Sequence, residues 1–91
     1  MKIKDPQESV TVEFDFSSEL DLVDTAAVSV YIHGVGADAG LVSFLTGAHQ
    51  VAGAKVYQRI SGGLRGMRYR IECLGTRGAD VIKRKDIIHI E

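Results

Sequence analysis

The stretch from Gly62 to Cys73 constrains the fold of this chain more than any other. It opens with glycines at 62, 63 and 66 and continues as a strict two-residue alternation. One set of positions is Met67, Tyr69, Ile71 and Cys73, and the other is Arg68, Arg70 and Glu72. Because successive side chains of a β-strand point to opposite faces, the pattern predicts a strand with one buried and one solvated face.

The same alternation recurs along the chain and predicts most of its other strands. β-Branched and aromatic residues occupy every second position in several segments, which is typical of half-buried strands. We expect strands at 9–16, 26–33, 54–60, 67–74 and 81–91, and a further short strand at 41–45. Lys83-Arg84-Lys85 interrupts the last segment, where we expect a bulge, a turn or an exposed edge.

The segments between these strands carry the residues of turns and loops. Residues 1–8 are polar and include Pro6, so we expect a flexible N-terminal arm. Residues 17–22 are too few for a stable helix, so we expect a connection that tucks Leu20 or Leu22 under the core. The remaining connections are expected to be a flexible glycine-rich loop at 34–40, a loop at 48–53, a tight hairpin at 61–63 and a second hairpin at 75–80.

Short strands separated by turns at roughly 8–12-residue spacing are typical of a β-sandwich. No segment shows the apolar stripe of a helix of three turns. We therefore predict an all-β fold, an antiparallel β-sandwich of six to seven strands with immunoglobulin or fibronectin type III character, over residues 9–91. The predicted core consists of Val10, Val12, Phe14, Val28, Val30, Ile32, Val56, Ile60, Tyr69, Ile71, Cys73, Ile88 and Ile90.

Two polar side chains occupy strand positions that face the predicted core, so they need hydrogen-bond partners. Gln58 shares the parity of Val56, so its amide is expected to be semi-buried and paired. Tyr69 stands near the start of its strand, after Gly66. In immunoglobulin-type sandwiches a tyrosine there often turns its hydroxyl back to the chain just upstream. The alternative is an ordinary core tyrosine.

Composition and charge narrow the function classes. The chain has 91 residues, a formal net charge of −1 and hydrophobic and charged fractions of 45% and 25%, which are ordinary values for one globular domain. Near-neutral charge gives no global attraction to nucleic acid or anionic lipid. A lone cysteine cannot form an intramolecular disulfide, and no apolar run has the length of a leader or a membrane span. We expect a soluble protein folded in a cytoplasm, without nucleic-acid or membrane partners.

No motif for reaction chemistry is present. Cys73 shares the parity of Ile71 and Tyr69, so a small buried residue is favoured over a nucleophile paired with histidine. The serines lack a Gly-x-Ser-x-Gly elbow, and the glycines at 34, 36 and 40 lack dinucleotide-loop spacing. A metal site would draw on His33, His49 and His89 with Asp38 or Asp80, which show no zinc-ligand spacing. We expect a non-enzymatic protein without catalytic residues, cofactor or metal.

Basic residues gather toward the end of the chain. Lys83-Arg84-Lys85 joins Arg65, Arg68, Arg70 and Arg77 in this group. The group is compatible with nucleic-acid contact, but near-neutral charge and the lack of an exposed aromatic ladder favour a solvated edge or an interface. If their strands are neighbours, Arg68 and Arg70 are expected to pair with Glu13 or Asp15.

The chain resembles a family of small proteins encoded in tailed bacteriophages and prophages. The resemblance rests on residues 56–73 with Thr76 and Gly78, and on an opening formed by Lys4-Asp5-Pro6 and residues 10–15. Family members lie among virion structural genes and are regarded as immunoglobulin-like domains without catalytic sites. The basic Lys83-Arg84-Lys85 departs from the family pattern. The resemblance therefore implies no shared role for the surface of the last strand.

The resemblance implies a virion structural or accessory protein that acts as a protein–protein assembly module. Its partners would be phage head or tail proteins, further copies of the chain in a homo-oligomer, or both, and it would be found in the virion or, during assembly, in the bacterial cytoplasm. The candidate partner contacts on solvent-facing positions are Tyr31, Tyr57, Leu74 and Ile87. A carbohydrate- or cell-surface-binding module is the alternative, for which Tyr31 and Tyr57 would supply the aromatic platform. A small metal-dependent enzyme built on the histidines is a third hypothesis.

Overall fold

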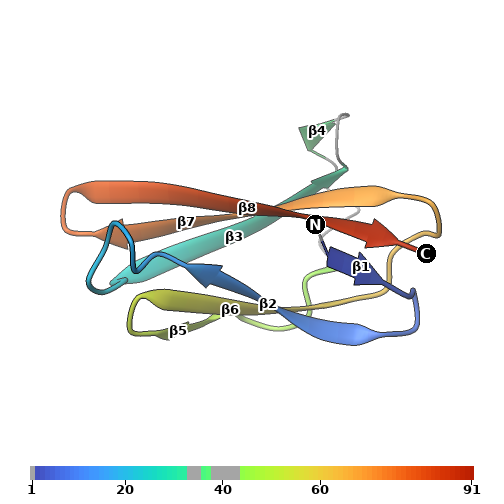
Figure 1. The fold of residues 1–91 in the computed structure, drawn as a ribbon, viewed down its shortest axis with the longest axis horizontal. Helices are drawn as coiled ribbons and strands as arrows, with labels where there is room; N and C mark the ends of the chain where they lie inside the picture. The colour runs from blue at the N-terminus through green and yellow to red at the C-terminus, as the bar shows by residue number, and fades with distance from the viewer. Residues whose placement is uncertain (1, 33–35, 38–43) are drawn as a thin grey trace.

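The computed structural model describes residues 2–32, 36–37 and 44–91, and these contain eight β-strands (Figure 1). The strands are β1 (Lys2–Lys4), β2 (Ser9–Asp15), β3 (Thr25–Ile32), β4 (Gly36–Ala37), β5 (Gln50–Ala52), β6 (Lys55–Ser61), β7 (Arg68–Arg77) and β8 (Asp80–Ile90). Three of them, β1, β4 and β5, have three residues or fewer. The predicted all-β fold is confirmed.

The strands form two sheets that pack face to face. One sheet has the order β1-β8-β7-β3-β4 and the other the order β2-β6-β5. In an immunoglobulin sandwich, strands C, F and G share one sheet and B, E and D share the other. Here β3, β7 and β8 correspond to the first set and β2, β6 and β5 to the second. The sandwich predicted from the alternation is therefore present, with immunoglobulin-type strand order.

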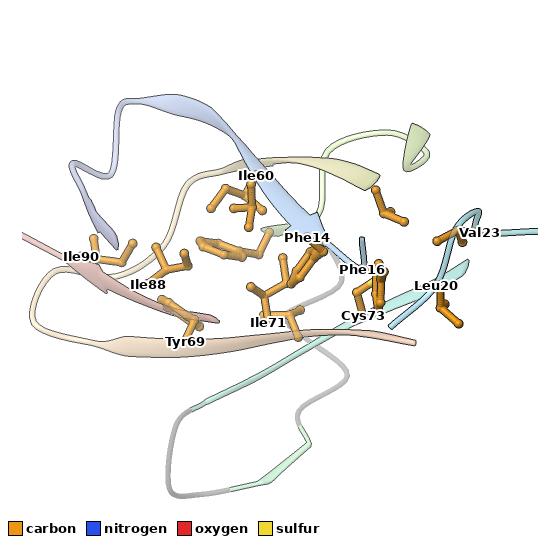
Figure 2. Close-up of a cluster of buried hydrophobic side chains, with 14 residues drawn as sticks. Phe14, Phe16, Leu20, Val23, Ile60, Tyr69, Ile71, Cys73, Ile88 and Ile90 are labelled. Carbon is orange, nitrogen blue, oxygen red and sulfur yellow. The ribbon is translucent and has the colours of Figure 1, made fainter. Parts of the chain in front are cut away.

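The core lies between the two sheets (Figure 2). Most of the predicted core residues are buried, while Val10, Val28 and Ile32 are only partly buried against it. Phe16, Leu20, Val23 and Phe44 join the core from connecting segments. Of the two leucines that could tuck under the core, Leu20 is 4% exposed and Leu22 is 39% exposed.

The N-terminal residues correct the expectation of a flexible arm. Lys2–Lys4 pairs in parallel with Ile88–Ile90, so β1 is an edge strand of the larger sheet. The Lys4 side chain is 1% exposed, and its Nζ donates hydrogen bonds to the backbone oxygens of Gly62 at 2.6 Å and Asp5 at 2.8 Å. A lysine can bury its aliphatic stem while its amine binds carbonyl oxygens. A strand that contains such a lysine therefore looks polar in the sequence, and for this reason it was not predicted.

Two further connections differ from expectation. The segment expected to be a loop at 48–53 contains β5, which pairs antiparallel with β6. All three β5 residues are exposed, so buried and exposed positions do not alternate and the sequence does not predict this strand. The segment at 61–63 does not form a hairpin, because β6 and β7 belong to different sheets and the chain crosses between them there. Gly63, with φ +100°, passes so close to Ile90 that a Cβ would lie 2.9 Å from its side chain.

The last strand is continuous through its basic residues. The β7–β8 register runs without a bulge from Arg68↔His89 to Arg77↔Asp80, so the expected hairpin at 75–80 narrows to a two-residue turn at Gly78-Ala79. Of the three possibilities for Lys83-Arg84-Lys85, the exposed edge is the one found. β1 pairs with β8 only at Ile88–Ile90, and no other described strand pairs with that side of β8.

The expected strand at 41–45 and glycine-rich loop at 34–40 fall largely outside the described residues. Within them, Gly36–Ala37 forms β4 beside β3, and Leu45 makes an isolated antiparallel bridge to Ile60.

Candidate protein-interaction face

The outward face of the larger sheet brings together three of the four predicted contact residues. The register places Tyr31 of β3 opposite Arg70 of β7, and Arg70 opposite Ile87 of β8. The three side chains form a row across the sheet on the face away from the core. Leu74 lies on the same face, opposite Ala27 and Lys83 and 39% exposed. Strands far apart in the sequence therefore build one surface from these residues.

Arg70 is the centre of this surface. Its guanidinium carbon lies 4.8 Å from the ring centroid of Tyr31, within the range of a cation–π interaction. Its Nε lies 2.6 Å from a carboxylate oxygen of Glu72, and Lys83 approaches the other oxygen at 3.4 Å. The side chains of Arg70 and Glu72 are only 26% and 13% exposed. The Tyr31 ring on the β3 side and the Glu72 carboxylate on β7 therefore hold the arginine by a cation–π contact and an ion pair, while its Nε makes no hydrogen bond with the described residues.

A second row continues the surface toward β1. Arg68 lies opposite His89, and Ile3 of β1 lies beside His89 and is 57% exposed. The Nδ1 atom of His89 is buried and makes no hydrogen bond with the described part of the chain. Charged, aromatic and aliphatic groups are thus mixed in these two rows.

Tyr57 lies on the opposite side of the molecule. It faces outward from β6, between Glu13 of β2 and Gln50 of β5. The four predicted contact residues therefore do not form one site. Tyr31, Leu74 and Ile87 share a face, and Tyr57 belongs to the other one.

The condition for ion pairs between Arg68 or Arg70 and the acidic residues of β2 is not met, because β7 and β2 are not neighbouring strands. β2 belongs to the smaller sheet, so Glu13 points away from β7 and instead approaches Lys55 at 3.8 Å. Alternation assigned the correct parity to every one of these side chains. It does not say which strands are neighbours, and that information decides the partners.

Cys73 is buried, as the sequence predicts, and its surroundings disfavour the thiolate. The residue is 0% exposed, and burial raises the pKa of its thiol to about 11. A nucleophilic cysteine needs the opposite shift, together with access to substrate. Cys73 is therefore a core residue in this fold.

The remaining candidate ligands are dispersed. His33 lies outside the described residues, while His49 and His89 are half-buried on different elements. Over residues 2–32, 36–37 and 44–91, no three His, Cys, Asp or Glu side chains come together as a metal site would require. The same residues contain no helix with the length and apolar character of a membrane span.

Reasoning from the sequence missed the central role of Arg70 and Glu72. Both stand on the solvent parity of β7, so their direction was readable. Their low exposure was not, because it depends on Tyr31 from β3 and Lys83 from β8 arriving on either side. No local pattern signals such an arrangement.

Fold and surface together define an immunoglobulin-type β-sandwich with a pre-ordered outer face on its larger sheet. No protein-family model matches the chain, and comparison with curated proteins and with solved structures finds no significant match to either.

Proposed function

We propose that this protein is a non-catalytic assembly module that binds another protein through the outward face of its larger sheet. The observation that carries the proposal is the row formed by Tyr31, Arg70 and Ile87. Tyrosine and arginine are enriched at protein interfaces, where their large side chains supply most of the binding energy. A partner that covers this row buries aromatic and aliphatic surface around a fixed guanidinium.

The rigidity of the row supports this role. Holding a flexible side chain in place on binding costs roughly 0.5–1.5 kcal/mol, and an arginine already fixed by neighbours avoids much of that cost. Arg70 is fixed in this way by the Tyr31 ring and the Glu72 carboxylate. The face is thus ordered before a partner arrives.

The resemblance of the sequence to small phage and prophage proteins supports a virion setting. On this proposal the chain is a structural or accessory protein of a phage particle, and the partner is a head or tail protein. The protein would accordingly be found in the virion, or in the bacterial cytoplasm during assembly. The genes beside its own test this setting directly, since a position away from capsid and tail genes argues against it.

A carbohydrate-binding module is less well supported. Such a module needs an exposed aromatic platform. Tyr31 is covered on one side by Arg70, and Tyr57 lies on the opposite face of the sandwich. The two tyrosines therefore cannot stack on one sugar chain, and we expect no signal on a glycan array.

The decisive experiment measures binding to the purified head and tail proteins encoded beside this gene. Arg70→Ala and Ile87→Ala should each weaken binding at least about tenfold, as expected when a central interface residue is truncated. The matched control is Arg59→Ala, which removes an exposed arginine from β6 in the other sheet. Equal binding by Arg70→Ala and wild type, with both variants folded, overturns the proposed face.

A further inference from the structure

One side of the sandwich leaves the edges of both sheets open. On the smaller sheet, β2 pairs with β6 on one side and with no described strand on the other. On the larger sheet, β8 is open over residues 80–87, beyond the short β1. The two edges lie on the same side of the molecule, because Arg84 of β8 lies over the ring of Phe16, which directly follows β2.

On their outward faces, the two open edges carry opposite charges. The outward-facing residues of β2 end in Glu13 and Asp15, both exposed, while β8 presents Lys83 and Lys85, also exposed. The spacing is two residues in both strands. A strand pair can therefore place both acids opposite both lysines at once, since cross-strand neighbours on one face recur every two residues.

The strand directions suit such a pairing. Figure 1 shows β2 and β8 running in opposite directions on the two layers of the sandwich. A two-fold axis parallel to the strands would bring β8 of one molecule beside β2 of another, and would repeat the same contact on the other layer. The joined strands are antiparallel, with Lys83 opposite Asp15 and Lys85 opposite Glu13.

We propose that two copies of this chain join through these edges, β8 of each pairing with β2 of the other, into a sandwich of two continuous sheets. Each edge gains the backbone hydrogen bonds that it lacks in the monomer. The interface runs along the β8 and β2 edges, whereas the Tyr31–Arg70–Ile87 row crosses the outward face of the larger sheet. Lys83 and Lys85 point to the same face as Ile87, so Arg70→Ala on β7 is the variant that tests the partner face without changing a paired edge.

Pairings of like edges are disfavoured by the same charges. Two β8 edges that meet about Arg84 place Lys83 opposite Lys85 of the other copy, and like charges directly opposite one another are destabilising. Two β2 edges bring only acidic and hydroxyl side chains together. The existing contacts do not compete strongly, since Glu13–Lys55 at 3.8 Å and Lys83–Glu72 at 3.4 Å involve partly exposed pairs.

The test is a charge swap read by analytical ultracentrifugation from micromolar to millimolar concentration. One variant carries Lys83→Glu and Lys85→Glu, and the other carries Glu13→Lys and Asp15→Lys. Each variant alone places like charges at all four paired positions, so we expect its dimer to be weaker than the wild-type dimer by about 100-fold. An equimolar mixture restores opposite charges at every position, and we expect it to dimerise like wild type.

A charge-matched control and a face control complete the design. Arg65→Glu with Arg68→Glu reverses two exposed charges that lie on neither β2 nor β8 and should leave the dimer unchanged. Arg70→Ala removes the centre of the partner face and should also dimerise normally. Circular dichroism establishes that each variant is folded before it is used.

Three results overturn the dimer. They are a wild-type protein that stays monomeric at millimolar concentration, a dimer that survives either double charge reversal, and a mixture of the two reversed variants that does not associate. Loss of the dimer in Arg70→Ala alone would assign self-association to the partner face instead.

Discussion

The hydroxyl oxygen of Tyr69 accepts a hydrogen bond from the backbone N–H of Leu64 at 3.0 Å. The ring is 2% exposed and stacks on Phe44, with 4.7 Å between ring centroids. The bond ties the start of strand β7 to the segment that crosses from one sheet to the other. It is the upstream contact that immunoglobulin-type sandwiches make at this position, and it confirms that reading of Tyr69 over an ordinary core tyrosine.

Tyr69→Phe should lower the free energy of unfolding by about 1 kcal/mol, because it removes this hydrogen bond while keeping the ring and its packing. Chemical denaturation with urea measures the effect. Tyr57→Phe is the matched control, since Tyr57 lies on the outer face of β6, and it should change stability little. Equal losses in the two variants would show that the hydroxyl of Tyr69 contributes nothing specific.

Lys4→Met should destabilise the protein by about 1–3 kcal/mol, because the carbonyls of Gly62 and Asp5 lose a charged donor while the buried stem is kept. Hydrogen exchange gives a local readout. The N–H of Glu91 donates to the carbonyl of Lys4 at 2.9 Å, so it should exchange faster if β1 detaches. Lys2→Met, on the same short strand, should leave that amide protected, and wild-type protection in Lys4→Met would contradict the assigned role.

Substitution of the two adjacent glycines between β6 and β7 distinguishes the cost of backbone strain from the cost of side-chain crowding. Gly62→Ala meets open space at φ +76°, so it should cost about 1 kcal/mol through conformation alone. Gly63→Ala adds a Cβ 2.9 Å from the Ile90 side chain at φ +100°, and overpacking of this kind adds about 1–3 kcal/mol. Thermal unfolding should therefore rank Gly63→Ala well below Gly62→Ala, and the reverse order would exclude crowding by Ile90.

Acid should remove a contribution to stability made by Asp24. Its carboxylate accepts hydrogen bonds from the Arg77 side chain at 2.8 Å and from the backbone N–H of Gly78 at 3.2 Å. The bond from Arg77, followed by the bond from Gly78, lowers the pKa of Asp24 below its ordinary value of 3.8. The contribution is therefore fully present above pH 3.8 and is lost as the pH falls through the lower, folded-state pKa.

Unfolding of wild type and Asp24→Asn, compared from neutral pH to pH 3, measures that contribution. We expect wild type to be the more stable protein at neutral pH and the gap to narrow in acid. Asp80→Asn, on the other side of the turn, serves as the control for loss of a nearby carboxylate. A gap that stays constant across this range would show that the charge of Asp24 does not support the turn.

Local sequence determined most of the strands. The alternation at 9–16, 26–33, 54–60 and 67–74 indicates which side of each strand faces an apolar layer, and the structure agrees on parity at every described residue of the strands in these segments. Gln58 follows the same logic. It is 2% exposed, and its amide nitrogen donates to the carbonyls of Arg59 at 2.8 Å and Gly47 at 3.2 Å. Parity is a property of consecutive residues, so a single chain reveals it.

Partners between strands are not a local property, and only the tertiary structure decided them. Alternation could not reveal that β6 and β7 lie in different sheets, that Lys2–Lys4 pairs with β8, or that Arg70 meets Tyr31 rather than the acids of β2. These contacts join residues far apart in the chain, and they form because two apolar faces must cover each other. The sequence by itself therefore determined which way each side chain points, and the packing of the two sheets decided what it meets.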